Sequence, residues 1–552
     1  MEKQPERRVQ HFRQILLWPL QLMPIREDAQ IQTHWALLQS ASAENPWHEI
    51  VDEFTDDPSG FQERHYGEFV TFLPYVQRML YGEGKGRGAA AGESPIRVFR
   101  RDDVRKLRLT FPRDSRGPIE FEVAHVDLYF FYDLDIVILA VEILAMDIEF
   151  ERAQEALYRF GRAYPTHWED DGHGGHCCAK VEWLGEDGVV LATSDYERRE
   201  KYLSYVCRFR APCISSHWEF LLRPLVLHHS MEPGPIRYRL LEYHRMPVLG
   251  YFALEDPRQL TRADFVRLAF VTAPGPSDVL PFSEHHLRNF EFRYCLDRFW
   301  RARSDGPPGT RMLCSGEAFM VVGSAEDPYF MDADYGLREQ FRHQYFLVFL
   351  IAHMHKAALL MLSDRLVNTL NQLDISDPES VKRFKRQIRQ LKEIFLRFTH
   401  RYWFHEVSDQ AQAKDLYHMC QEHLGTERLY AEVRDEVEGM NAYLDSDALR
   451  RQANTVVRLT VVTIFGLIGT VTTGFLGMNL LDETDRPLWF RAALFVGIFI
   501  PVILLTFYTM VKSKRLSDFL DALSDERLGF SAKWAALLDV WRKPSRRGAK
   551  RR

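Results

Sequence analysis

The sequence lacks an excess of basic residues. Its 552 residues include 71 Lys and Arg against 77 Asp and Glu, a formal net charge of -6. Proteins that bind nucleic acids normally carry a basic excess or a basic patch, so we expect no nucleic-acid partner. Repeated Cys-x-x-Cys spacings are also missing. The seven cysteines are scattered, which favours reduced thiols in a cytosolic compartment over a disulfide framework.

Motifs for catalysis and for export are missing too. Residues 82–92 (GEGKGRGAAAG) are rich in glycine but lack the Gly-Lys-Ser/Thr ending of a phosphate-binding loop. No Ser/His/Asp or Cys/His catalytic arrangement can be placed. The apolar stretch 15–24 is short, is interrupted by Pro19 and Pro24, and has no cleavage site. We therefore expect no enzyme, and an N-terminus that stays in the cytosol.

Two long apolar runs stand near the C-terminal end. Residues 456–476 read VVRLTVVTIFGLIGTVTTGFL, and residues 488–511 read LWFRAALFVGIFIPVILLTFYTMV. Each is long enough to cross a hydrocarbon core of about 30 Å as a helix. Arg458 and Arg491 lie near the ends, where they can reach the interface. The runs predict a transmembrane hairpin; a buried helical hairpin in a soluble protein is the alternative.

The distribution of charge predicts the orientation. Basic residues precede the first run and follow the second: Arg450, Arg451, Lys512, Lys514 and Arg515. Acidic residues lie in the linker between the runs: Asp482, Glu483 and Asp485. Basic residues mark the cytoplasmic side. We expect a multi-pass protein of the cell (inner) membrane with both termini cytoplasmic. The three linker acids either concentrate cations or form an ordinary solvated loop.

A third apolar stretch, residues 344–362, contains His353, His355 and Lys356 near its middle. Polar and charged residues at the centre of a membrane helix are costly. The stretch is therefore predicted to be a buried helix and not a third span.

The first span carries two patterns. Small residues recur every fourth position, which permits close helix packing in lipid: Gly466, Thr470, Gly474 and Gly469, Thr473, Gly477. A second face alternates hydroxyl and apolar residues and is the candidate pore lining: Val456, Leu459, Thr463, Leu467, Thr470 and Gly474. The hydroxyls can equally donate to carbonyls of their own helix. Since two spans cannot enclose a pore, a conducting form needs several subunits.

The first span ends in Gly477, Met478 and Asn479. A span ending in Gly-Met-Asn, a short acidic loop, a second span and a basic tail resembles the CorA family of magnesium transporters over residues 426–515. The same triplet at 439–441 stands in a polar region and is predicted to be coincidental. The sequence departs from the family at Leu476, where an aromatic is usual, and in the loop LLDETDRP.

The resemblance implies a homopentameric, funnel-shaped channel for divalent cations, with Gly477–Asn479 as its selectivity motif. It implies an α/β cytoplasmic domain, long stalk helices and a two-helix transmembrane hairpin. The expected organisation is a helical extension and linker (1–95), the α/β domain (96–330), stalk helices (331–455), transmembrane helix 1 (456–479), an external loop (480–487), transmembrane helix 2 (488–511) and a basic cytoplasmic tail (512–552).

Within the cytoplasmic part, apolar and β-branched runs predict strands at 106–111, 126–131, 135–140, 248–253, 265–272 and 312–322. Helices are predicted at 337–370, at 380–420 with a cap at Asp377, and from Thr426 into the membrane. An apolar stripe along the last helix should pack against neighbouring helices: Leu429, Val433, Val437, Met440 and Leu444.

Two groups of residues are candidate metal ligands. The first has side chains that suit zinc, although its spacing matches no familiar finger: Asp170, Asp171, His173, His176 and Cys177. The second, Asp445 and Asp447 on the stalk, is implied by the resemblance as a regulatory site, with a solvated face as the alternative. No resident cofactor is expected. The expected partners are divalent metal ions, membrane lipid and further copies of the chain.

The sequence thus predicts passive transport of Mg²⁺, with Co²⁺ or Ni²⁺ as further cargo. A zinc transporter of the same superfamily is one alternative. A membrane-anchored cytosolic protein that senses metal or binds partners, without transport, is the other.

Overall fold

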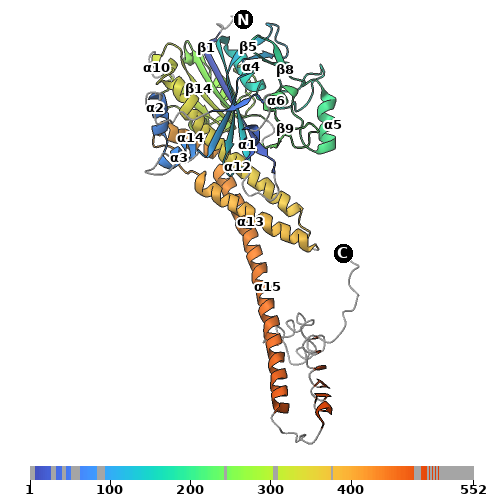
Figure 1. Cartoon of the computed structure of the whole chain (residues 1–552). Coiled ribbons are helices and arrows are strands. Elements are labelled where there is room, and N and C mark those ends of the chain that lie inside the picture. The colour runs from blue at the N-terminus through green and yellow to red at the C-terminus, as the bar shows by residue number, and fades with distance from the viewer. Residues whose placement is uncertain are drawn as a thin grey trace. The chain divides into compact units, whose positions relative to one another are not determined.

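The computed structural model describes residues 7–25, 33–39, 45–50, 63–83, 94–241, 245–301, 309–374, 377–477 and 487–490, and single positions between 492 and 508. The chain divides into two compact units, Met1–Val437 and Glu438–Arg552. The first unit holds the sheet and most of the helices (Figure 1).

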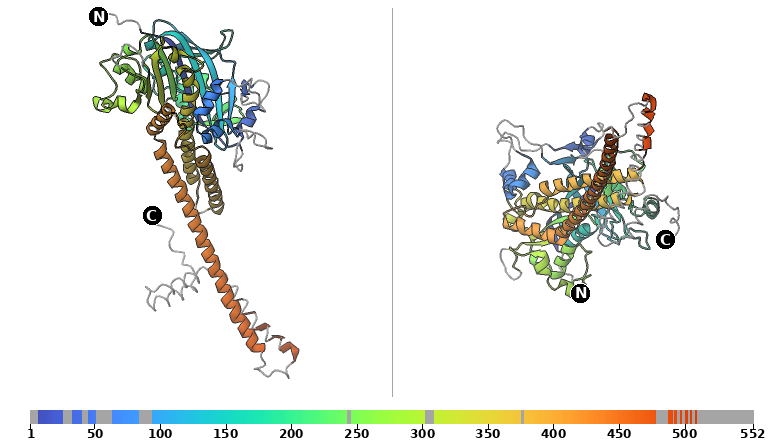
Figure 2. Two further views of the ribbon diagram at one scale, coloured as in Figure 1. Left: turned by 90° about the vertical axis from the view of Figure 1, so that its left-hand side faces the viewer. Right: turned by 90° about the horizontal axis from the view of Figure 1, so that it is seen from below.

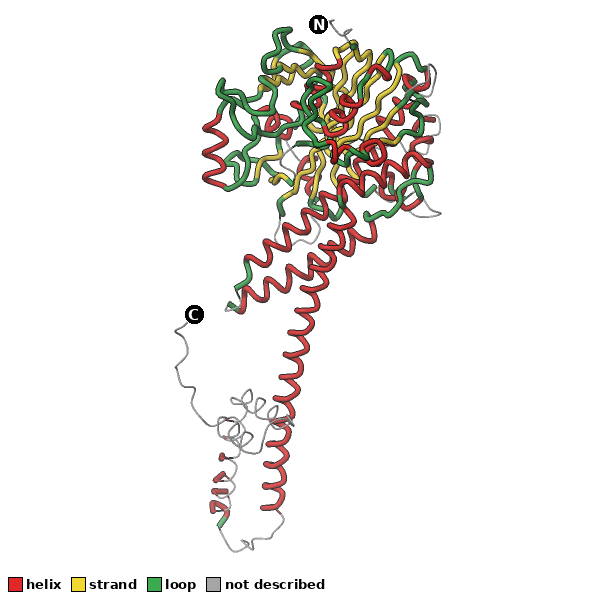
Figure 3. The backbone as a smooth tube through the Cα atoms, turned by 180° about the vertical axis from the view of Figure 1, so that it is seen from behind, coloured by secondary structure: helices red, strands yellow, loops and turns green. Residues whose placement is uncertain are grey.

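The described strands form one 14-stranded sheet with the order β12-β13-β14-β11-β1-β6-β5-β4-β7-β8; β10 also pairs with β1 and β9, and β3 with β2 and β5. Most neighbours are antiparallel, while β11–β14 and β9–β10 are parallel. The strands, yellow in Figure 3, are β1 (Arg8–Leu22), β2 (Trp47–Glu49), β3 (Ile96–Arg101), β4 (Lys106–Thr110), β5 (Ile119–Phe131), β6 (Ile136–Glu149), β7 (Lys180–Leu184), β8 (Val190–Thr193), β9 (Leu225–Leu227), β10 (Ile236–Leu240), β11 (Val248–Leu254), β12 (Cys295–Leu296), β13 (Arg311–Cys314) and β14 (Ala318–Ser324).

The helices of the first unit are α1 (His34–Gln39), α2 (Glu63–Thr71), α3 (Pro74–Tyr81), α4 (Phe150–Arg159), α5 (Arg199–Phe209), α6 (Ser216–Leu222), α7 (Arg262–Phe270), α8 (Glu284–Leu287), α9 (Phe290–Tyr294), α10 (Pro328–Met331), α11 (Leu337–Gln340), α12 (Phe346–Asn371), α13 (Pro378–Arg401) and α14 (Ala411–Leu424). A short 3-10 helix, η1 (Pro257–Gln259), precedes α7, and a short π-helix, η2 (Phe341–Tyr345), precedes α12. The last described helix, α15 (Thr426–Gly477), belongs to both units.

Helices cover both faces of the central strands. Successive residues of a strand point to opposite faces. On β11, Phe252 contacts Phe150 of α4, while its neighbour Tyr251 contacts Phe341 of η2. Burial on both faces explains why β6 and β11 are nearly continuous apolar runs. Figure 2 shows the sheet and its helices from two further sides.

The expected helical extension over residues 1–95 is wrong for its first part. Arg8–Leu22 is the strand β1, paired with β6 along nearly its whole length. Its other edge pairs with β11 up to Leu16 and with β10 from Leu20. Pro19 lies at this changeover between neighbours, a position that tolerates a residue without an N–H. The proline that interrupts the apolar stretch 15–24 therefore lies within a central strand.

The expected strand at 265–272 is also wrong, because Arg262–Phe270 forms α7. Thr261 and Asp264 make a reciprocal capping box at its N-terminus. Asp264 also pairs with Arg7 at 2.6 Å, which ties the cap to the start of β1. Phe265 and Val266, which belong to the pattern that suggested a strand, are buried on this helix.

The predicted helix 380–420 is interrupted in the structure. α13 ends at Arg401 and α14 begins at Ala411. Within the break, the carbonyl of Val407 accepts from the Leu73 amide at 2.9 Å, and Ser408 donates to the carbonyl of Thr71. Residues 407 and 408 therefore bond to the turn between α2 and α3 and do not continue the helix. The predicted cap is confirmed: the Asp377 carboxylate accepts from two amides of the first turn of α13.

Candidate functional site

α15 is the element that carries the candidate pore residues. It begins at Thr426, as predicted, and is described as one uninterrupted helix of 52 residues as far as Gly477. Gly425, with φ at +65°, ends α14 and allows the sharp change of direction into α15. Of the predicted selectivity motif, Gly477 is the last described residue; Met478 and Asn479 lie outside the described residues.

The candidate pore face is exposed along the described helix. Val456 and Leu459 are 57% and 67% exposed. Thr463, Thr470 and Gly474 are exposed as well, while the side chain of Leu467 lies outside the described residues. Exposed apolar side chains on successive turns indicate a surface that another apolar medium covers, either lipid or another protein chain.

The threonine hydroxyls of α15 bond to their own helix. Thr463 donates to the Leu459 carbonyl at 2.8 Å, and Thr470 donates to the Gly466 carbonyl at 2.9 Å. Thr460 and Thr473 make the same bond four residues back. The sequence left two alternatives for these hydroxyls, lining a channel or donating to carbonyls of their own helix. In the single chain they donate to their own helix, and these bonds satisfy them without water.

The row Gly466, Thr470 and Gly474 is exposed in the single chain, whereas Gly469 of the second row is buried. A Cβ added at Gly466 or at Gly474 meets no atom within 4 Å. Glycine in a helix interior is destabilising by roughly 1 kcal/mol relative to alanine. The open space at both positions would allow another helix to pack closely against this face.

The second span and the loop before it are described only in part. The loop acids Asp482, Glu483 and Asp485 lie outside the described residues, as does the tail 512–552. Leu488 and Trp489, at the start of the predicted second span, are 85% and 70% exposed. Exposure of this size for large apolar side chains repeats the pattern seen on α15.

Among the described residues, one helix, Leu337–Asn371, is long and apolar enough to cross a membrane, and most of it is buried inside the protein. It contains the third apolar stretch, and its prediction as a buried helix is confirmed. His353 and His355 are fully buried and donate to the carbonyls of Gly316 and Tyr402. Burial lowers the pKa of His353 to about 3 and the pKa of His355 to about 4, so both rings are neutral donors.

The predicted zinc ligands between 170 and 177 do not converge. Asp170 and Asp171 are exposed, while Cys177 is fully buried. Burial raises the pKa of the Cys177 thiol to about 12, and a protonated thiol is a poor metal ligand. His176 instead contacts the hydroxyl of Tyr158, and the His173 amide donates to the Asp171 carboxylate at 3.1 Å.

Across the described part of the chain, no group of three or more His, Cys, Asp or Glu side chains is arranged to hold a metal ion. On α15 the Asp445 carboxylate accepts from the Asn441 amide at 2.8 Å. The side chain of Asp447 lies outside the described residues.

Sequence reasoning missed a cavity of about 1020 Å³ in the first unit. Its walls come from α3, from the turn after β5 and from the end of α13, and they include Arg78, Tyr132 and Arg401. Asp133 in that turn accepts from Arg401 at 2.6 Å and so joins α13 to the sheet. No local sequence signal marks the cavity, because its walls are distant in sequence.

A scan against protein-family models finds no match to this chain, and neither do searches of curated proteins and of solved structures.

Proposed function

We propose that the chain is a membrane protein that conducts divalent cations, with Mg²⁺ as the main cargo and Co²⁺ or Ni²⁺ as further cargo, through a pore formed by α15 from several copies, five by the family resemblance. One observation carries the proposal. A single helix joins the α/β unit to an apolar segment with exposed side chains, and its last described residue is the Gly477 of a Gly-Met-Asn triplet.

The chemistry of the triplet suits a hydrated ion. Mg²⁺ is small and gives up its waters reluctantly. A ring of Asn479 carboxamide oxygens accepts hydrogen bonds from those waters without removing them. A carboxylate ring would hold the ion more tightly, and conduction requires weak binding. Repeated copies of the acids at 482, 483 and 485 would concentrate cations at the entrance.

The driving force needs no nucleotide. An inside-negative potential favours entry of a cation by about 2.3 kcal/mol per charge per 100 mV, hence about 4.6 kcal/mol for a divalent ion. This agrees with the missing phosphate-binding loop. Transport is then passive and follows the membrane potential.

The test is metal flux into proteoliposomes with Mg²⁺, Co²⁺, Ni²⁺ and Zn²⁺, for the wild-type chain and for Asn479→Ala. The chain supplies a matched control in its second Gly-Met-Asn triplet: Asn441 lies on α15, and its side chain donates an exposed hydrogen bond to Asp445 at 2.8 Å. Asn441→Ala should keep wild-type flux, while Asn479→Ala should abolish flux or lose selectivity among the four metals.

The outcomes separate the alternatives. Flux for Zn²⁺ alone would identify a zinc transporter. The absence of flux for every metal, in a folded oligomer tested at several internal metal loads, would favour an anchored sensor. A strictly monomeric chain in detergent would contradict the channel outright, since two spans cannot enclose a pore.

A further inference from the structure

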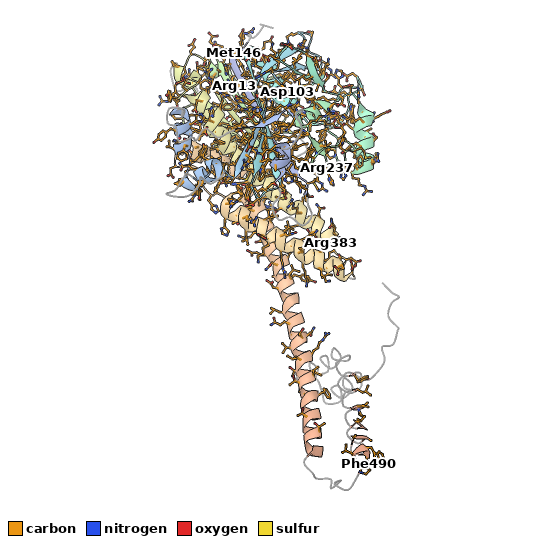
Figure 4. The ribbon with its side chains drawn as sticks, in the orientation of Figure 1. Arg13, Asp103, Met146, Arg237, Arg383 and Phe490 are labelled. Atoms are coloured by element: carbon orange, nitrogen blue, oxygen red, sulfur yellow. The ribbon has the colours of Figure 1, made fainter. Side chains whose placement is uncertain are left out.

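The first two thirds of α13 carry a strongly basic outer face. Residues 378–392 contain six basic side chains and one acidic one: Lys382, Arg383, Lys385, Arg386, Arg389, Lys392 and Glu379. The apolar residues Phe384, Ile388 and Leu391 are buried. At 100° per residue, Lys382, Arg386 and Arg389 point away from that buried side. Figure 4 labels Arg383 on this helix.

This face keeps basic side chains that no described residue neutralises, although Lys385 and Arg386 have contacts of their own. Lys382 pairs with Glu379 at 2.7 Å, but both side chains are more than 70% exposed, and such pairs contribute little. Arg389 and Lys392 make no ion pair with any described residue. Like charges three and four residues apart on one helix repel each other. The face is therefore suited to an acidic partner.

α15 carries the complementary charge. Residues 427–447 contain seven acids and two arginines. Val433 and Val437 of the predicted apolar stripe are buried, while the acids among the described side chains are exposed. Asp435, Glu438 and Asp445 are spaced by three and seven residues, which places them on one face of the helix. That face lies away from the buried stripe.

The two rows also match in length. Lys382 to Lys392 and Asp435 to Asp445 each span ten residues, about 15 Å along a helix at 1.5 Å per residue. Glu438 makes no ion pair with a described residue, and the Asp445 carboxylate bonds to a neutral amide. Asp435 pairs with the adjacent Arg434 at 2.9 Å. Each row therefore keeps charged side chains without an ion pair to a described residue: Arg389 and Lys392 on α13, and Glu438 and Asp445 on α15.

We infer that the basic face of α13 in one copy docks on the acidic face of α15 in a second copy. This rests on the proposed homo-oligomer and deepens it, by naming the surfaces through which the cytoplasmic parts of neighbouring copies meet. Exposed charge pairs are screened by salt, so the contact weakens as ionic strength rises.

The test is zero-length carbodiimide cross-linking, which joins a lysine amine to a carboxylate in direct contact. Two differently tagged full-length copies are co-expressed and purified together in detergent. One copy loses its acids (Glu438→Gln, Asp445→Asn). The other keeps them but loses its reactive amines (Lys382→Arg, Lys385→Arg, Lys392→Arg), with the charge unchanged. Any peptide joining α13 to Glu438 or Asp445 must then bridge two copies.

We expect such bridging peptides by mass spectrometry, with a yield at least tenfold lower in 1 M NaCl. Charge reversal in α13 (Arg389→Glu, Lys392→Glu) should lower the yield from the remaining lysines at least tenfold. Adding Glu438→Lys and Asp445→Lys should restore cross-links with the reversed polarity. Arg208→Glu on the exposed part of α5 is the matched control and should leave the yield unchanged.

Failure of this inference is distinguishable from failure of the channel. An intact oligomer without bridging peptides would overturn the docking surface and leave the channel standing. The docking surface would also be overturned, and the channel left standing, if charge reversal in α13 abolished co-sedimentation with phosphatidylglycerol vesicles while no bridging peptides formed. The basic face would then bind lipid headgroups. A monomer in detergent would overturn both.

Discussion

Two apolar helices of this chain have similar composition and opposite surroundings. α12 is packed against β1 and β6 of the sheet, and its side chains from Val348 to Met354 are buried. The apolar part of α15 leaves Val456, Leu459 and Ile464 half or more exposed. Hydropathy therefore does not by itself predict whether an apolar helix of this chain is buried or exposed.

The placement of polar groups separates them. α12 has two histidines in its middle, and the protein supplies a carbonyl acceptor for each. The apolar part of α15 has threonines, whose hydroxyls need no partner outside their own helix. A helix whose polar groups need outside partners fits a folded core, while a helix that satisfies its own fits lipid.

The largest effect is expected from a charged residue placed in α12, which tests whether this helix is part of the core. Leu359→Asp would bury a carboxylate at a position that is fully buried, with no partner. We expect a loss of about 4 kcal/mol or more in unfolding free energy, enough to prevent folding of the first unit. Expression and thermal unfolding followed by circular dichroism measure it. A variant that melts like the wild type would show that α12 is not a core helix.

The same change in α15 should act differently. Ile464 is half exposed, so Ile464→Asp leaves the packing of the first unit intact. A charge near the centre of a membrane helix costs about 3 kcal/mol in insertion. We expect an unchanged melting temperature of the first unit but a smaller membrane fraction on flotation. Equal membrane recovery for variant and wild type would argue against a span here.

The buried histidines predict a smaller effect, on pH dependence. The folded pKa of His355 is about 4, below its ordinary unfolded value of about 6.5. The unfolded state therefore binds more protons, and stability is full above pH 6.5 and falls as the pH drops towards 4. At pH 5 this one histidine costs about 2 kcal/mol.

The measurement is urea unfolding of the wild-type chain and of His355→Gln at pH 7.5 and pH 5. Glutamine keeps a donor for the Tyr402 carbonyl but does not titrate. The loss of stability between the two pH values should shrink by about 2 kcal/mol in the variant. The same loss in both proteins would mean that His355 is not held neutral by burial.

Local signals in the sequence predicted several elements well. Strands β4 and β11, the start of α15 and the cap at Asp377 all lie where capping residues, turn residues and apolar patterns placed them. Signals that depend on distant partners were less informative. Cys177 has a suitable side chain for a metal, but its burial decides against that role. The cavity beside α13 has no sequence signal at all.

For the candidate pore, the sequence supplied nearly everything that is known. The triplet 477–479, the acidic loop and the second apolar run are patterns along the chain. Of the triplet, only Gly477 is described by the structure, so the roles of Met478 and Asn479 remain proposals that flux must test.

By itself, the sequence determined the two apolar runs, the charges around them and the helical path of α15, because hydropathy, charge and helix periodicity are properties of neighbouring residues. Only the tertiary structure decided that Arg8–Leu22 is a central strand despite Pro19, and that residues 265–272 belong to α7 or its cap. Each of these outcomes depends on partners far away in the chain: β6, β10 and β11 for the strand, and Arg7 for the helix cap. Backbone pairing and burial between distant segments outweigh local propensity.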